Sequence, residues 1–266
     1  GLVVLARFLG RSRLASLTGA LAFAGGGFFA ARMFGGQYPH VSSAAWVPWV
    51  FWSAARLARY RRWRDAVPLA MLLALQLFAG LPQFVLVTLC GLPVLWLPRR
   101  WQWQLRGAAG TGGRLLLALL IFLVCVYPVV QPLAELLAHS QRRAGLSAAD
   151  ALGDALAPAR WHAVWLPLAS IEPFPPAAIT HLTEFIECTL FIGWSPWLVL
   201  AVAVAAGLWR RRALWRWVLL GGASLLLAAG AHLPFYAWLW KIVPGFTMLR
   251  AHLLSTRYPV TVCDFF

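Results

Sequence analysis

The stretch that most constrains this chain is residues 44–100, in which apolar runs alternate with short clusters of arginine. An apolar run leads into a basic cluster, and two further apolar runs, each about one helix long, lead to Arg99 and Arg100. The basic cluster consists of Arg56, Arg59, Arg61, Arg62 and Arg64. Apolar runs of helix length between basic loops are typical of an integral membrane protein.

The composition favours the same class of protein. Hydrophobic residues make up 61% of the 266 residues, charged residues make up 12%, and the mean hydropathy is +0.72. A soluble domain of this composition would lack the polar groups to cover its surface. The net charge of +15 does not indicate nucleic-acid binding, because the basic residues are divided among short clusters between apolar runs.

The charges also predict which side of the membrane each loop occupies. Under the positive-inside rule we expect the basic clusters in the cytoplasm. These clusters are Arg7 to Arg13, Arg56 to Arg64, Arg99 to Arg114 and Arg210 to Arg216. Most of the acids fall instead in one hydrophilic segment at 134–187, which we expect on the outer side.

The predicted fold is all-α, a polytopic transmembrane helix bundle of about seven to eight membrane segments, some short or broken, with one extracytoplasmic loop region. The expected segments are Leu14 to Phe34, Ser43 to Leu57, Ala66 to Gly80, Phe84 to Leu97, Leu115 to Val130, Thr189 to Trp209 and Trp217 to Trp240. Three parts follow: membrane helices at 1–133, the outer segment at 134–187, and membrane helices at 188–266 with an outer loop at 241–257. Both ends suggest a fragment, since the chain opens without methionine and closes soon after a new apolar run.

Glycine and proline predict where these helices bend or stop. Residues 25–27 are all glycine and would permit either close helix packing, which we favour, or a local break. Residues 35–40 form a polar turn that places His40 outside. After the outward crossing, Gln131 to Arg143 has the pattern of a separate amphipathic helix.

The hairpin at 66–97 consists of two apolar runs of about 15 residues, each short for a full crossing. Its predicted turn is residues 81–83, because a proline there would break one long helix. Gln76 and Gln83 then lie in the outer half of the membrane, where an unpaired amide is costly. We expect a hydrogen bond between helices, with a substrate contact as the alternative.

The cysteines indicate no metal or redox site. Cys90, Cys125 and Cys188 lie in or beside apolar runs, and no pair has zinc-binding or redox spacing. We therefore expect buried, small hydrophobic side chains and predict no metal ligands from these residues.

Several short motifs occur along the chain in one order. They are Ala45-Trp46-Val47-Pro48, the run LQLFAGLPQ at 75–83, Pro132 to Leu137 with Ser140 and Arg142, and Val243 to Phe246 with Leu249-Arg250 and Arg257-Tyr258. With these motifs the chain resembles the YfhO family of bacterial membrane proteins over nearly its whole length. That family is similar to the GT-C superfamily of multi-pass glycosyltransferases.

The resemblance implies transfer of a sugar from a polyprenyl-phosphate donor to a cell-envelope acceptor, on the extracytoplasmic face of the bacterial inner membrane. The implied partners are membrane lipids and the lipid-linked sugar, and a divalent metal stays open as a cofactor. In this chemistry a carboxylate acts as base or holds a metal, while cations stabilise the leaving phosphate. The acid that such enzymes use usually follows the first membrane helix, a part expected upstream of Gly1.

Site residues follow from the resemblance and from the predicted topology. Arg250 and Arg257 lie outside, against the charge bias, where either lipid phosphates or a phosphate-bearing substrate would hold them. Arg142 and Arg143 are the substitutes for this role. The remaining candidates are His40 and Gln83 for the sugar or acceptor pocket, and Glu172 as base or metal ligand, with a solvated loop acid as the alternative for Glu172.

Two other functions stay open at this point. A lipid or polysaccharide transporter or flippase also uses discontinuous helices, although the chain shows no convincing internal repeat. A non-catalytic envelope assembly protein is the third alternative. Leucine at position 81, where many YfhO relatives are expected to have histidine, also leaves enzymatic activity of this chain open.

Overall fold

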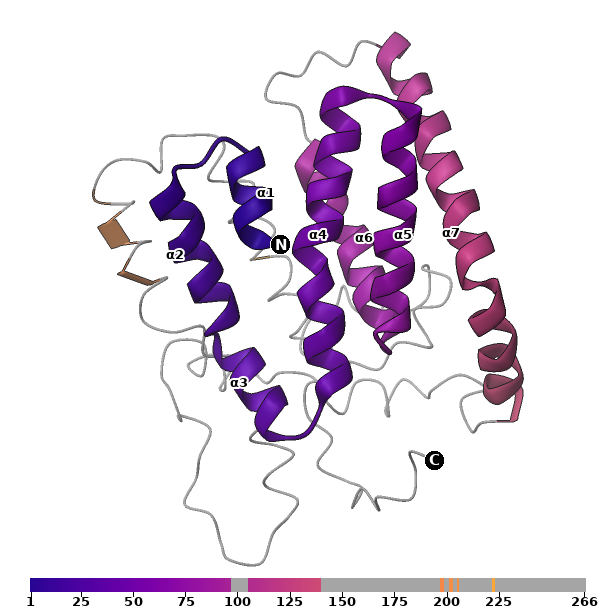
Figure 1. The fold of residues 1–266 in the computed structure, drawn as a ribbon, viewed down its shortest axis with the longest axis horizontal. Helices are drawn as coiled ribbons and strands as arrows, with labels where there is room; N and C mark the ends of the chain where they lie inside the picture. Colours follow the sequence, from indigo (N-terminus) through magenta and orange to yellow (C-terminus); the bar gives the residue numbers. More distant parts are fainter. Residues whose placement is uncertain (97–104, 140–196, 199–200, 203–204, 206–221, 223–266) are drawn as a thin grey trace, which may run out of the picture. The chain divides into compact units, whose positions relative to one another are not determined.

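The computed structural model describes residues 1–96 and 105–139, together with positions 197–198, 201–202, 205 and 222 (Figure 1). Within these residues the regular elements are all helical, as the sequence predicts. They are α1 (Leu2–Phe8), α2 (Arg13–Ala24), α3 (Gly27–Phe34), α4 (Tyr38–Tyr60), the 3-10 helix η1 (Trp63–Asp65), α5 (Ala66–Phe78), α6 (Pro82–Trp96) and α7 (Leu105–His139). The segments predicted at 189–240 lie almost wholly outside the described residues.

The chain divides into two compact units. The first contains α1, nearly all of α2, and α4 to α7, and the second contains α3. Helix α2 ends at Ala24 and α3 begins at Gly27, so the glycine run interrupts the helix. The alternative of a local break is therefore confirmed, and close packing at these glycines stays a prediction.

Within the described residues, two segments have the length and hydropathy of a membrane-spanning helix. Arg13–Phe34, which comprises α2 and α3, has a mean hydropathy of 1.5, and Gly110–Leu136 within α7 has 2.4. At 1.5 Å per residue the second segment is about 40 Å long, more than the roughly 30 Å of a bilayer core. Apolar side chains such as Leu120 and Val124 are exposed along it. Both segments are therefore compatible with membrane insertion.

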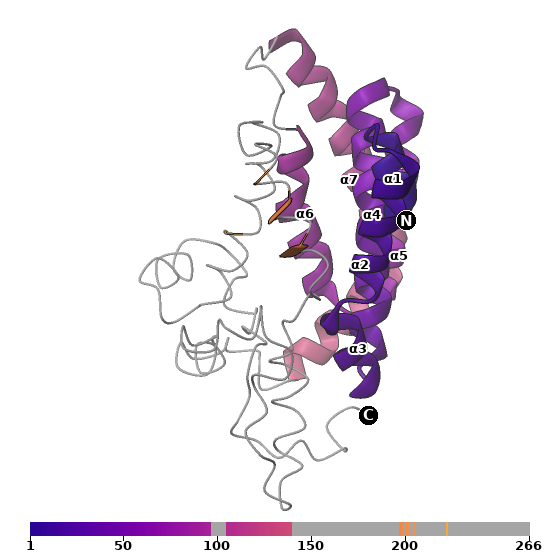
Figure 2. The ribbon, with the colours of Figure 1, turned by 90° about the vertical axis from the view of Figure 1, so that its left-hand side faces the viewer.

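In the first unit, α5 packs against both α4 and α7, and α6 packs against α4 and α5 (Figures 1 and 2). The buried core joining these four helices consists of Val50, Ala54, Leu57, Ala66, Leu69, Ala70, Leu73, Val85, Leu92 and Ala118. Small residues permit the close approach. A Cβ atom placed on Gly91 of α6 would lie 2.7 Å from Cζ of Phe51 in α4. Glycine at position 91 therefore lets the Phe51 ring pack directly on the α6 backbone where these two helices meet.

Helix α4 begins earlier than the sequence predicts. It starts at Tyr38 instead of Ser43, because Pro39 suits the first turn of a helix, where its missing N–H is not needed. His40 is thus a helical residue, and the expectation of a polar turn through residue 40 is wrong. Pro48 remains inside the helix and is buried.

The predicted helical hairpin at 66–97 is present, but its turn lies slightly earlier. Helix α5 ends at Phe78, and Pro82 is already the first residue of α6. Gly80 has a φ of +114°, a conformation that other residues avoid. The turn is therefore residues 79–81, centred on a glycine, and the expectation of 81–83 is wrong.

Helix α7 is longer than expected. It runs from Leu105 to His139 through Pro128 and Pro132. One helix thus replaces the predicted crossing that ended at Val130 and the separate helix predicted from Gln131. The cysteine prediction also fails in part, since Cys90 is exposed.

Candidate functional site

The predicted site residues are only partly within the described chain. His40 lies in the first turn of α4, and Gln83 is the second residue of α6. Those outside the described residues are Arg142, Arg143, Glu172, Arg250 and Arg257. Of these candidates, the structure therefore describes the surroundings of His40 and the backbone position of Gln83.

The start of α4 and the turn of the hairpin lie against each other. The rings of His40 and Phe84 are 6.1 Å apart at an interplanar angle of 86°, an edge-to-face contact. A Cβ atom on Gly80 would lie 3.1 Å from Cβ of Pro39. Because Phe84 directly follows Gln83, the structure brings His40 close to the first turn of α6, where Gln83 lies.

Gln76 lies one helical turn before the hairpin turn and links three helices. Its side chain is fully buried, and Nε2 donates to the carbonyl oxygen of Ser43 at 3.2 Å and to Oγ1 of Thr88 at 2.8 Å. Thr88 Oγ1 donates in turn to the carbonyl oxygen of Phe84 at 2.7 Å. The predicted hydrogen bond between helices is confirmed for Gln76.

Gln76 and Ser43 each keep a buried polar atom without a hydrogen-bond partner among the described residues. These atoms are Oε1 of Gln76 and Oγ of Ser43. An unpaired buried polar atom costs about 1–3 kcal/mol, so such atoms are candidates for contact with water or a ligand. We name His40, Ser43, Gln76 and Thr88 the amide cluster. It offers hydrogen bonds and contains no carboxylate.

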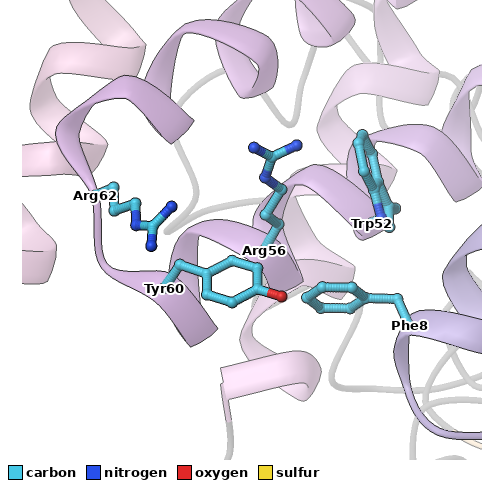
Figure 3. A pocket seen from close by; sticks show the side chains of 5 residues that line it. All are labelled: Phe8, Trp52, Arg56, Tyr60 and Arg62. Carbon is cyan, nitrogen blue, oxygen red and sulfur yellow. The ribbon is translucent and has the colours of Figure 1, made fainter.

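A second polar site lies at the opposite end of α4. Arg56 and Arg62 line a pocket of about 480 Å³ with three aromatic side chains, Phe8, Trp52 and Tyr60 (Figure 3). Phe8 comes from α1, while the others come from the last turns of α4 and the residues that follow it. We name these five residues the arginine pocket.

The arginine pocket is held by a buried acid beside it. Nε of Arg56 lies 2.9 Å from Oδ1 of Asp65, and the Asp65 side chain is only 2% exposed against 35% for Arg56. After α4, Arg61 takes a left-handed conformation with φ 55°, and the chain turns back into η1, which ends at Asp65. The guanidinium of Arg56 also lies 5.6 Å from the Trp52 ring. This geometry holds Arg56 between an acid and an aromatic face.

Aromatic rings also position the neighbouring arginines. Cζ of Arg62 lies 5.5 Å from the Tyr60 ring, and Cζ of Arg59 lies 5.3 Å from the Phe8 ring. Nη1 of Arg59 donates to the carbonyl oxygen of Phe8 at 3.3 Å, which ties α1 to α4. Sequence reasoning treated these arginines as loop charges and missed the pocket. The available signal was Asp65, a single acid directly after five arginines.

Neither polar site has the composition of a metal centre. Within the part of the chain that the structure describes, no group of three or more histidine, cysteine, aspartate or glutamate side chains could hold a metal ion. The two sites differ in their chemistry: Ser43, Gln76 and Thr88 of the amide cluster are uncharged and buried, whereas the arginine pocket is cationic and open.

The chain was compared with protein families, curated proteins and solved structures. No protein-family model matches the chain, and neither a curated protein nor a solved structure matches it.

Proposed function

We propose that this chain is part of a multi-pass glycosyltransferase of the bacterial inner membrane, with about seven to eight membrane segments. It transfers a sugar from a polyprenyl-phosphate donor to a cell-envelope acceptor on the extracytoplasmic face. The observation that carries the proposal is the amide cluster, in which the uncharged side chains of Ser43, Gln76 and Thr88 are buried between apolar helices at the end of α4 opposite the arginine pocket. The sequence motifs supply the class of reaction.

The position of the amide cluster suits a lipid-linked sugar. Helix α4 has 23 residues and is about 35 Å long at 1.5 Å per residue, enough to cross a bilayer core of roughly 30 Å. With the arginines in the cytoplasm, Ser43 lies about 8 Å below the outer end of the helix. A sugar carried just below the headgroups would reach that depth.

The chemistry of the amide cluster also suits a sugar. Each sugar hydroxyl both donates and accepts, and Oε1 of Gln76 and Oγ of Ser43 are buried atoms with hydrogen-bonding capacity left among the described residues. His40 and Gln83 are proposed to complete this side of the pocket. A hydroxyl-rich ligand would satisfy atoms that are otherwise costly to bury.

The reaction itself needs groups elsewhere in the chain. The bond between the sugar C1 and the phosphate oxygen breaks, and a bond from C1 to the acceptor oxygen forms. The acceptor proton passes to a carboxylate, for which Glu172 is the candidate, and polyprenyl phosphate leaves with both bonding electrons. Arg250 and Arg257, with Arg142 and Arg143 as substitutes, are proposed to stabilise the leaving phosphate.

A transfer assay with the intact protein in lipid nanodiscs tests this proposal. Radiolabelled polyprenyl-phosphate sugars are supplied with envelope acceptors, and the wild type is compared with a His40→Ala variant and an Arg250→Ala, Arg257→Ala double variant. We expect transfer by the wild type and by an Arg64→Ala control, and its loss in the double variant. No transfer with any donor by a folded protein would contradict the proposal, and movement of the intact donor across the bilayer would favour a flippase.

A further inference from the structure

The arginine pocket contains more positive charge than its surroundings neutralise. Residues 56–65 include five arginines and one acid, Asp65, which is occupied by Arg56. Arg62 has no carboxylate partner among the described residues, and its contact is the face of the Tyr60 ring. An anion in the pocket would complete the charge balance.

The two pocket arginines are positioned before any ligand binds. The contact through Nε holds Arg56 to Asp65, which leaves its two Nη groups as donors, and 35% of the side chain stays exposed. Figure 3 shows the Arg62 guanidinium beside Tyr60, with Arg56 and Trp52 farther along the pocket. Arginines held in this way lose less conformational entropy when they bind a phosphate.

The aromatic walls indicate where the anion comes from. Trp52, Tyr60 and Phe8 surround the arginines, and tryptophan and tyrosine concentrate at the level of lipid headgroups. The pocket lies at the end of α4 that the charge distribution places in the cytoplasm. There the leaflet carries anionic lipids, which attract basic segments next to the membrane.

We propose that the arginine pocket binds the phosphate of an anionic phospholipid of the cytoplasmic leaflet, between Arg56 and Arg62. The aromatic side chains lie against the glycerol and the first methylene groups of the acyl chains. This inference is independent of sugar transfer and needs only that the basic end of α4 faces the cytoplasm. Binding here would fix the bundle's position relative to the membrane surface.

The test measures retained lipid on the purified full chain by native mass spectrometry. The probes are phosphatidylglycerol, phosphatidylcholine and inorganic phosphate, titrated separately and in competition. The Arg62→Gln variant is the informative one, because Arg62 has no ion pair whose loss would unfold the site. The matched control is Arg64→Gln. It removes the same charge at a position two residues after Arg62, and the Arg64 side chain is exposed and lies outside the pocket.

We expect the wild type to retain phosphatidylglycerol in preference to phosphatidylcholine, and Arg62→Gln to weaken that retention about tenfold, as the loss of a charge-assisted contact predicts. Arg64→Gln should bind within about twofold of the wild type, because Arg64 does not line the pocket. Equal weakening by both variants would reduce the effect to general charge and overturn the proposal. Equal retention of phosphatidylcholine, or displacement of the lipid by millimolar inorganic phosphate, would overturn it as well.

Discussion

The amide cluster and the arginine pocket lie at opposite ends of α4, and their polar groups are stabilised in different ways. At one end, Gln76 is fully buried and neutral, and its partners come from the neighbouring helices. At the other end, Arg56 and Arg62 keep access to solvent, and aromatic rings with one buried acid hold them. This contrast is the one expected of a helix that crosses a bilayer, because a charge costs little free energy at the headgroup level and much more below it.

The largest effect is expected at the charged end, from the Arg56 and Asp65 pair. Arg56→Ala should lower the free energy of unfolding by about 3 kcal/mol, because it leaves the Asp65 carboxylate buried without a counter-ion. Asp65→Ala should cost less, about 1–2 kcal/mol, since the remaining guanidinium is 35% exposed and can be solvated. Unfolding of each variant in mixed micelles, followed by circular dichroism, gives both values.

Arg64→Ala serves as the control for this pair, since its exposed side chain lies beside Asp65 in the sequence. It should change stability by less than about 0.5 kcal/mol. Equal losses of unfolding free energy in Arg56→Ala and Asp65→Ala would mean that the difference in burial between the two side chains has no energetic consequence. That result would contradict the distinction between a solvated cation and a buried anion.

A substitution at Gly91 tests the apolar contact between α4 and α6, which lies between the two polar sites. Gly91→Val should destabilise the protein by about 2 kcal/mol through overpacking, because the added atoms meet the Phe51 ring at less than contact distance. A second substitution, Phe51→Ala, should recover part of this loss by making room. Without any recovery in the double variant, the close approach of α4 and α6 would not be the cause.

The hairpin shows how far the sequence alone leads. Its two short apolar runs and a turn near Pro82 can be predicted from the sequence, because the length of an apolar run and the positions of proline and glycine constrain the backbone directly. The boundaries shift by a few residues, since Pro39 and Pro82 suit the first turn of a helix as well as they break its middle. Local composition cannot distinguish these two roles.

A smaller effect is expected at the neutral end. Gln76→Met removes two hydrogen bonds between helices and also removes the unpaired Oε1 atom, so the two changes partly cancel. We expect a loss of about 0.5–1 kcal/mol, measured by the same unfolding assay. Thr88→Val is the companion variant, because it keeps the bond to Ser43. A loss at Gln76 as large as that at Arg56 would contradict the contrast between the two ends.

The candidate sites were predictable to different extents. Gln76 stands out as an amide in an apolar run, and its bond between helices follows from the cost of burying it. Its partners do not stand out, because Ser43 and Thr88 are common in such helices and only packing brings them together. The arginine pocket depends on Phe8, which is distant in sequence and reaches α4 through the position of α1.

The most direct test of the central claim is the sidedness of the two ends of α4. In a cysteine-free background, Tyr38→Cys marks the amide end and Arg64→Cys marks the arginine end, and both positions are exposed. A membrane-impermeant maleimide is added to intact spheroplasts and to permeabilised ones. We predict that Tyr38→Cys is labelled in both, whereas Arg64→Cys is labelled only after permeabilisation. Labelling of both positions in intact spheroplasts, or the reverse pattern, would contradict the account.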